Sequence, residues 1–411
     1  MNQIAAPTLR QDAQVIGLVG LAHSVSHFFH LILAPLFPWL KPAFGLSYAE
    51  LGFAMTMFYV VSGTGQVLAG FVVDRIGARR VLLGGLAFMG IAAVILSQAQ
   101  NYAMLIAGSM LAGLGNSVFH PADFTILNQR VSAPRLGHAF SVHGITGNLG
   151  WAAAPVFLLA VNGMADWRTA LLAAACIPFA VLALLFLHGD VLEGVGRRTS
   201  AGVAPAGEAG PHALAFLKVP GVWMCFGFFF ITALALGGIQ SFATPSLRNL
   251  YGMSLPLAAD CFTAYMLCSA LGTICGGFIA SRAARHERTI AIAFISAGLI
   301  SMLVASAALP PAVVLILMGA IGFGSGVAGP SRDLLIRSTA PKNATGRVYG
   351  VVYSGLDVGM MLAPLMFGAF MDAGRHAWVF FAIGFFQILA ISTAVGIGAR
   401  ADRAPARPQA A

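Results

Sequence analysis

Apolar segments of about 20 residues recur along the whole chain, and the short connections between them hold most of the charged residues. A helix of about 20 apolar residues crosses the hydrocarbon core of a bilayer, which is near 30 Å thick, so each segment predicts a membrane-spanning helix. The first stretch is too long for a signal-peptide core and lacks a convincing small-residue cleavage site, so it is expected to be retained. The twelve predicted spans are residues 14–40, 48–72, 80–98, 102–130, 136–161, 168–188, 221–247, 257–281, 289–308, 312–338, 346–371 and 376–399.

The composition leads to the same class of protein. Of the 411 residues, 58% are hydrophobic and only 9% are charged, whereas about a quarter of the residues of a soluble domain are charged. A soluble fold could not bury so much apolar surface, so the bilayer is the main solvent of this chain. We expect an all-α membrane protein.

The basic residues predict the topology. The net charge of +9 is spread through the short connections and forms no single patch, which argues against nucleic acid as a partner. With the N-terminus inside, the outer connections receive only Lys41, Arg168, Arg248 and Arg375. This asymmetry follows the positive-inside rule only if the number of spans is even and both termini are cytoplasmic.

The sequence offers little support for an enzyme or for a bound cofactor. The five cysteines fall within or at the ends of apolar segments without a Cys-x-x-Cys spacing, so they predict neither a disulfide framework nor a zinc site. No phosphate loop or nucleophile with a partner is evident. We expect no enzymatic activity, no cofactor and no metal site.

The sequence indicates that the chain consists of two related halves. A segment rich in Gly, Ala, Pro and charge predicts a cytoplasmic linker over residues 189–217, between six-helix bundles at 1–188 and 218–411. At an offset of about 209 residues, six glycines and prolines of the first half fall on the same residue types in the second, which implies shared backbone geometry. The first-half positions are Gly113, Gly115, Pro121, Gly137, Gly150 and Pro155, and their partners are Gly322, Gly324, Pro330, Gly346, Gly359 and Pro364. Repeated halves are common in secondary transporters, whose substrate site lies where the halves meet.

The segment GFVVDRIGARRV, residues 70–81, resembles the signature loop of the major facilitator superfamily. The resemblance to this superfamily spans the chain and implies its fold of two pseudo-symmetric six-helix bundles. It also implies that Asp74 braces neighbouring helices in one conformation by pairing with Arg130, with Arg75 and Arg79 holding the loop at the cytoplasmic surface. The alternative is a merely basic turn. The second-half copy has Ser281 in place of Asp74.

Within the superfamily, the first half is most similar to bacterial fosmidomycin resistance exporters. The similarity lies in GNSVFHPAD, residues 115–123, and in the glycine-rich segment GITGNLGWAAAP that follows. It implies efflux across a bacterial inner membrane and antibiotic resistance. The antiporter motif of the fifth span is only partial, and the arginine that many drug/proton antiporters carry in the fourth span is replaced near Ser109. Proton coupling would therefore need another carrier.

Ionisable residues inside predicted spans are functional candidates, because an intramembrane charge costs several kcal/mol. They are Asp123, Arg332, Asp333, Asp357, His23, His27, His30, His120 and His143. In the first span, His23, His27 and His30 are spaced four and three residues apart, which places them on one stripe of a helix. Three interpretations stay open for this stripe: packing and hydrogen bonding, contact with a proton or substrate, and metal binding by neutral imidazole.

Asp123 and Arg332 occupy matching places in the two halves. One hypothesis is an ion pair between them that closes a cytoplasmic gate. The alternative is that each pairs within its own half, for example Arg332 with the adjacent Asp333.

Asp357 lies near mid-membrane, one turn beyond Tyr353, with no nearby cation in the sequence. It is our preferred proton carrier, because a carboxylate in such a place can load and release a proton. A structural, hydrogen-bonded aspartate is the alternative. Weaker polar or aromatic candidates, which helix packing explains equally well, are Gln240, Thr232, Asn116, Asn148 and Trp151.

These observations predict a monomeric secondary transporter that exchanges a drug or an anionic metabolite for protons by alternating access. The alternative is proton-coupled uptake of an organic anion, such as a carboxylate, bound by Arg332. A membrane-embedded enzyme or a sensor without transport is the third class, and the linker is too short for a signalling domain. The expected partners are the small-molecule substrate, protons and the lipid bilayer.

Overall fold

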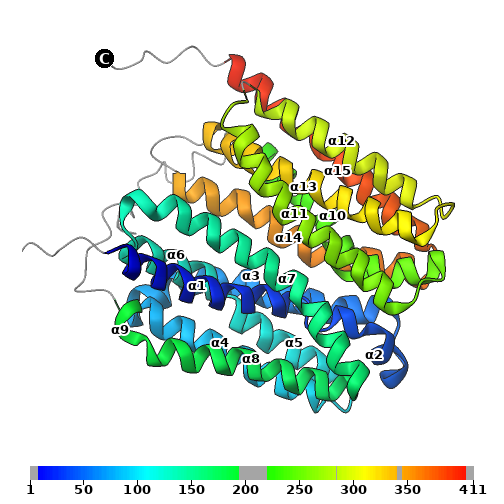
Figure 1. The fold of residues 1–411 in the computed structure, drawn as a ribbon, viewed down its shortest axis with the longest axis horizontal. Helices are drawn as coiled ribbons and strands as arrows, with labels where there is room; N and C mark the ends of the chain where they lie inside the picture. Colours follow the sequence, from blue (N-terminus) through cyan, green and yellow to red (C-terminus); the bar gives the residue numbers. More distant parts are fainter. Residues whose placement is uncertain (1–7, 194–219, 284, 340–344, 404–411) are drawn as a thin grey trace, which may run out of the picture. The chain divides into compact units, whose positions relative to one another are not determined.

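The computed structural model describes residues 8–193, 220–283, 285–339 and 345–403. Within these ranges the chain is helical apart from short turns and connections. It divides into two compact units, Met1–Ala201 and Gly202–Ala411. We call them unit 1 and unit 2 (Figure 1).

Unit 1 contains helices that are interrupted or bent at three of the six predicted spans. Its elements are α1 Leu9–His30, η1 Ala34–Leu36, α2 Phe37–Phe44, α3 Tyr48–Ile76, α4 Ala78–Ser97, α5 Tyr102–Asn116, α6 Phe119–Arg130, η2 Ala133–Arg135, α7 Leu136–Met164, α8 Trp167–Leu187 and α9 Gly189–Leu192. The first predicted span is divided into α1, η1 and α2, the second bends by 51° between Gln66 and Leu68, and the fourth is divided into α5 and α6.

Unit 2 has one helix for each of its predicted spans. These helices are α10 Pro220–Tyr251, α11 Leu255–Ala280, α12 His286–Val304, α13 Pro311–Thr339, α14 Thr345–Asp372 and α15 His376–Arg403. Over the described residues of both units, eleven helical segments are long and apolar enough to cross a membrane, or twelve if the bent α3 counts as one span. The expectation of an all-α membrane protein is confirmed.

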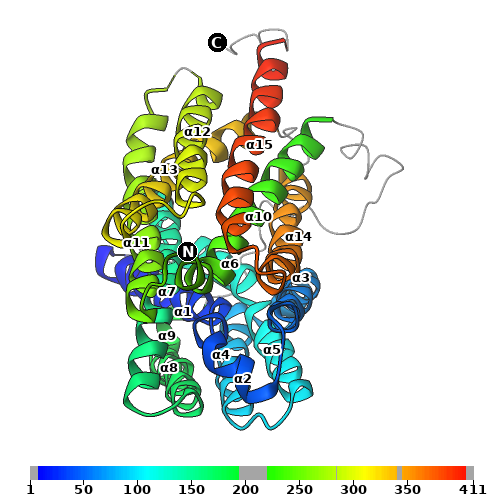
Figure 2. The ribbon, with the colours of Figure 1, turned by 90° about the vertical axis from the view of Figure 1, so that its right-hand side faces the viewer.

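Four pairs of packed helices recur in the two units. In unit 1, α1 packs on α7, α3 on α5, and α4 on both α5 and α8. In unit 2, α10 packs on α14, α11 on α13, and α12 on both α13 and α15. Figure 2 shows α4 between α5 and α8.

The repeated glycines explain this likeness. A Cβ atom added to Gly113 would collide with the main-chain carbonyl of Phe58, and one added to Gly322 would collide with that of Tyr265. Small residues let helix backbones approach closely in a membrane. The repeat in the sequence is therefore a repeat of helix contacts.

Both ends of α3 are set by local sequence. Ser47 and Glu50 form a capping box at the start of α3. Gly77, with φ of +92°, ends α3 and directly precedes α4. This turn holds residues 70–81 in a tight connection between two helices.

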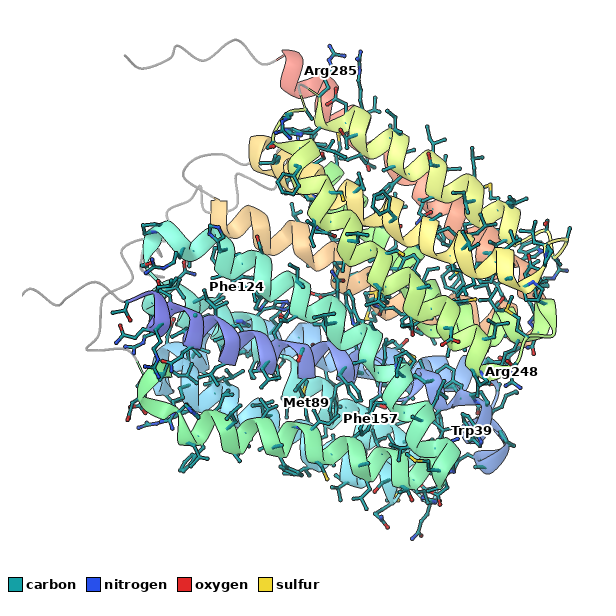
Figure 3. The ribbon with its side chains drawn as sticks, viewed as in Figure 1. Trp39, Met89, Phe124, Phe157, Arg248 and Arg285 are labelled. Atoms are coloured by element: carbon teal, nitrogen blue, oxygen red, sulfur yellow. The ribbon has the colours of Figure 1, made fainter. Side chains whose placement is uncertain are left out.

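The outward faces of the helices are apolar. Phe71, Ile292 and Ile316 are each at least 67% exposed, and other large apolar side chains project from the helices in Figure 3. Inside unit 1, by contrast, Met89 on α4 is fully buried (Figure 3). Side chains of this kind on an outer surface suit contact with lipid.

Candidate functional site

Five imidazoles and one carboxylate meet inside unit 1. They come from α1, α6 and α7, and we call them the histidine–aspartate cluster: His23, His27, His30, His120, Asp123 and His143. The side chains of Asp123, His23 and His143 are buried, and the other three are half-buried. The α1 histidines lie along one side of the helix, with ring centroids 4.4 Å apart for His23 and His27 and 4.9 Å apart for His27 and His30.

Asp123 is the only acid of this cluster and lies between two histidines. Its Oδ2 atom is 3.1 Å from Nε2 of His143 and 3.3 Å from Nδ1 of His23. The rings of these two histidines stack with centroids 3.4 Å apart. Asp123 thus has partners within its own unit, which the sequence left open as an alternative. Its pairing with Arg332 stays a prediction.

His30 is fixed by a hydrogen-bond network that also fixes its tautomer. The indole Nε1 of Trp151 donates to Nδ1 of His30 at 3.2 Å. Since an indole N–H only donates, Nδ1 is the acceptor and Nε2 carries the hydrogen. That Nε2 donates to Oδ1 of Asn116 at 3.2 Å, and the amide nitrogen of Asn116 donates to Ser62 Oγ at 2.8 Å. Both ring nitrogens of His30 are therefore occupied.

The break between α5 and α6 places polar groups inside the unit. Asn116 ends α5, and α6 begins at Phe119 with His120 and Pro121 in its first turn. The Nδ1 of His120 lies 3.0 Å from Oε1 of Gln66, which is at the bend of α3. Interrupted helices of this kind carry substrate and ion sites in transporters.

Glycines on α7 make room for the imidazoles. A Cβ atom on Gly147 would lie 2.6 Å from Nδ1 of His27 and 3.2 Å from Nε2 of His23. On the other side of the cluster, the ring of Phe124, labelled in Figure 3, lies 5.1 Å from that of His143. The glycine-rich segment of α7 is thus a packing surface for α1 histidines.

The cluster is suited to binding positive charge. Two sets of three residues bring a nitrogen or oxygen ligand atom from each residue within 4.8 Å of one another. One set is His23, Asp123 and His143, and the other is His23, His27 and His120. The sequence predicted no metal site and left metal binding open only for the stripe of His23, His27 and His30; Asp123 and His143, which complete one set, lie in other predicted spans.

The residues of the signature loop have different partners from those expected. Asp74 and Arg75 are exposed. Arg130 donates from Nε to the carbonyl of Val191 at 2.9 Å and from Nη2 to that of Asp190 at 3.2 Å. The structure thus does not bring Asp74 and Arg130 together, because the main-chain carbonyls around α9 take up the Arg130 guanidinium.

Arg79 also reaches the end of α8 and α9. It forms an ion pair with Glu193 and donates to the carbonyl of Phe186 at 3.2 Å. The two arginines therefore attach the α8–α9 segment to the ends of α4 and α6. Their role in gating stays a prediction.

Asp12 is a buried acid that sequence analysis did not select. Its carboxylate accepts hydrogen bonds from Ser132 Oγ and from Arg135 Nε, each at 2.6 Å. The contact ties the first turn of α1 to the connection between α6 and α7. Asp12 precedes the first predicted span, so the search for charges inside spans does not include it; an acid so close to a long apolar segment is the signal that would have found it.

In unit 2, the predicted site residues lie on α13 and α14. The Arg332 guanidinium lies over the ring of Phe229 at 5.0 Å. The Asp357 carboxylate is half-buried and has no hydrogen-bond or ion-pair partner among the described residues. The side chains of Asp333 and Tyr353 lie outside the described part of the chain. Gln240 on α10 is 5% exposed, and neither of its side-chain polar atoms has a described partner.

A helical membrane protein made of two repeated units, with ionisable groups buried among its helices, has the architecture of a secondary transporter. The profile of the Major Facilitator Superfamily matches residues 19–364 and 226–410. The chain belongs to this superfamily of membrane transporters. The resemblance found in the sequence is confirmed, and so is the fold.

The named relatives are bacterial proteins, two of them described as transporters. The fosmidomycin resistance protein of Escherichia coli K12 is 23% identical over 285 residues, which is 67% of each chain. An uncharacterized transporter of the same superfamily in Bacillus subtilis, YfnC, is 23% identical over 402 residues and covers 94% of this chain and 96% of its own. A probable nitrate transporter of Staphylococcus aureus, NarT, is 24% identical over 162 residues, 39% of this chain and 41% of its own.

A solved structure has the same fold. It is a bacterial homolog of the human lysosomal transporter Spinster in an inward-facing and occupied conformation. It superposes with a TM-score of 0.73 at 15% sequence identity and covers 97% of this chain and 98% of its own.

Proposed function

We propose that this transporter exports a small molecule, a drug or an anionic metabolite, in exchange for protons. The observation that carries the proposal is the Asp123 carboxylate, buried between His23 and His143 in unit 1. Histidine gains or loses a proton near neutral pH, and a carboxylate beside it shares that proton. The cluster is therefore the proposed site of the coupling proton.

The helices that supply the cluster explain how a proton would alter the transporter. Each bound proton changes the charge of a site from which water is largely excluded, so the energetic effect is large. The side chains of the histidine–aspartate cluster come from α1, α6 and α7, so the packing of these three helices must respond to the new charge. Proton binding then favours one arrangement of these helices over another, which is how a ligand drives alternating access.

Export is favoured over uptake by similarity to the fosmidomycin resistance protein. A multidrug resistance protein B homolog of Mycobacterium tuberculosis adds to this, at 29% identity over 125 residues. The second candidate is uptake of an organic anion. It is supported by the position of Arg332 and by the partial similarity to NarT.

The remaining features of the proposal follow the sequence. We place the transporter in a bacterial inner membrane as a monomer, with both termini cytoplasmic. Asp74, Arg75, Arg79, Arg130 and Asp333 are the proposed gating residues. In unit 2, Asp357 with Tyr353 is a proposed second proton site.

Transport by proteoliposomes under imposed pH gradients tests the proposal. The panel contains fosmidomycin, other antibiotics and small carboxylates. For exchange, a substrate moves opposite to the proton flux, and this movement falls to the rate of protein-free liposomes in Asp123→Asn. The matched control is Asp166→Asn, because Asp166 is an exposed helix cap and Asn caps equally well.

Each outcome of this assay distinguishes the candidates. Movement of a carboxylate in the same direction as protons selects uptake over export. Full pH-driven transport by Asp123→Asn, with loss in Asp357→Asn, would move the coupling site to unit 2. If no compound moved in response to a pH gradient of either direction, proton coupling would be contradicted.

A further inference from the structure

We propose that the histidine–aspartate cluster binds a divalent transition-metal ion of the zinc class. The ligands are His23, Asp123 and His143, with His27 and His120 as an adjoining pair that shares His23. The inference goes beyond proton coupling, and it concerns binding alone, so it can fail or succeed independently of the proposed function.

The distances around Asp123 are close to those between the ligands of a metal site. Zinc bonds to nitrogen and oxygen at about 2.0–2.2 Å, so neighbouring ligands of a tetrahedral site lie about 3.3–3.5 Å apart. Here Oδ2 of Asp123 lies 3.1 Å from Nε2 of His143 and 3.3 Å from Nδ1 of His23. The two rings are stacked with centroids 3.4 Å apart, so both imidazoles must turn about their Cβ–Cγ torsions before their lone pairs point to one ion.

Unpartnered atoms in the cluster form a second, independent observation. Among the described residues, His23 Nδ1, His27 Nδ1 and Asp123 Oδ1 are buried and accept or donate no hydrogen bond. Most buried polar atoms in proteins are hydrogen-bonded, so a group of unsatisfied ones requires an explanation. His27 and Asp123 belong to different sets of converging ligand atoms, so a cation bound at either set would provide a partner for the unsatisfied atoms of that set.

The chemistry of the ligands selects the kind of metal. Imidazole with one carboxylate suits Zn²⁺, Co²⁺ and Ni²⁺, whereas Mg²⁺ and Ca²⁺ prefer sites built entirely from oxygen. The amide oxygen of Gln66 can only accept, so it receives the Nδ1 hydrogen of His120 and leaves Nε2 of that ring with a free lone pair. Such an outer hydrogen bond is a usual support for a metal-binding histidine.

His30 serves as an internal contrast to these residues. Its two ring nitrogens are taken by Trp151 and Asn116, and it belongs to neither set of converging ligand atoms. We therefore expect His30 to orient its neighbours and not to ligate the ion.

Cobalt absorption measures the proposed site directly. The full-length protein, purified through a tag that contains no histidine, is stripped with EDTA, exchanged into metal-free detergent buffer and titrated with Co²⁺. The expected result is visible d–d absorption that saturates near one equivalent and disappears on addition of Zn²⁺. The variants Asp123→Asn and His143→Ala should bind at least about tenfold more weakly.

Two further variants serve as a control for surface histidines and a control for folding. His138→Ala is the matched control, because His138 is exposed on the same helix, and it should bind as wild type does. His143→Gln retains polarity and size if alanine disturbs folding, and it should also lose the absorption. Absence of the bands in wild type, or binding by His143→Gln equal to wild type, would overturn the site.

Transport assays with EDTA on both sides of the membrane separate the two proposals. Proton-driven transport without metal binding refutes only the metal site. Metal binding without proton-driven transport refutes only the proposed function.

Discussion

The imidazoles of His23 and His27 fit against α7 because Gly147 has no side chain at that place. The proposed proton site therefore depends on the absence of a Cβ atom at Gly147. Gly147, which the sequence alone explains by helix packing, thus shapes the proposed proton site.

Gly147→Ala should reduce proton-driven transport strongly, because the new methyl group would displace the His27 ring by overlapping it at 2.6 Å. Gly144→Ala on the same helix is the control, since a Cβ atom there meets nothing within 4 Å. The measurement is initial transport rate per correctly folded protein, with folding checked by size-exclusion profile. Equal rates for the two variants would contradict this account of α7.

The sequence identified all six residues of the cluster as candidates but did not predict that they meet, for a physical reason. The spacing of His23, His27 and His30 gives one helical stripe whatever the helix packs against. Whether Asp123 and His143 face that stripe depends on how α6 and α7 are rotated about their own axes. Spacing within one helix carries no information on that rotation.

At the scale of elements, the hydropathy pattern predicted the spans but not their interruptions. Hydropathy averaged over a span does not register a break of two residues such as the one between α5 and α6. Pro121 was the available signal, because proline is tolerated in a first helical turn and poorly inside a helix. The break matters because Asn116 and His120, on either side of it, contact α1 and α3.

The Asp12 contact is the second element-scale feature. Asp12→Asn should lower the thermal unfolding temperature in detergent by several degrees, because Arg135 loses its charged acceptor at the connection between α6 and α7. Asp166→Asn keeps its capping oxygen and should leave this temperature unchanged. The measurement is a fluorescence melting curve of the purified protein. An equal change of the unfolding temperature in the two variants would show that the buried Asp12–Arg135 contact does not stabilise the protein.

At the scale of the whole molecule, the repeat was the most informative feature of the sequence. Gly150 meets the carbonyl of Ser24, and its counterpart Gly359 meets that of Phe230. Glycine patterns predict such contacts because a side chain at these points would block them. The chemistry of the two units was less predictable, because the cluster of imidazoles in unit 1 has no sequence counterpart in unit 2.

An even number of spans places both ends of the chain on one face of the membrane. Reporter fusions at each end should both report the cytoplasm: a fluorescent protein should be bright at each end, and alkaline phosphatase should be inactive. Fusions that report opposite faces would contradict twelve spans and the topology derived from the basic residues.

The central claim is that the buried Asp123 cluster carries the coupling proton. It is tested most directly by comparing substrate counterflow with pH-driven transport in the same proteoliposomes, using whichever compound of the panel is transported. We predict that Asp123→Asn keeps counterflow and loses pH-driven accumulation, while Asp166→Asn keeps both. Undiminished pH-driven accumulation by Asp123→Asn would contradict the claim.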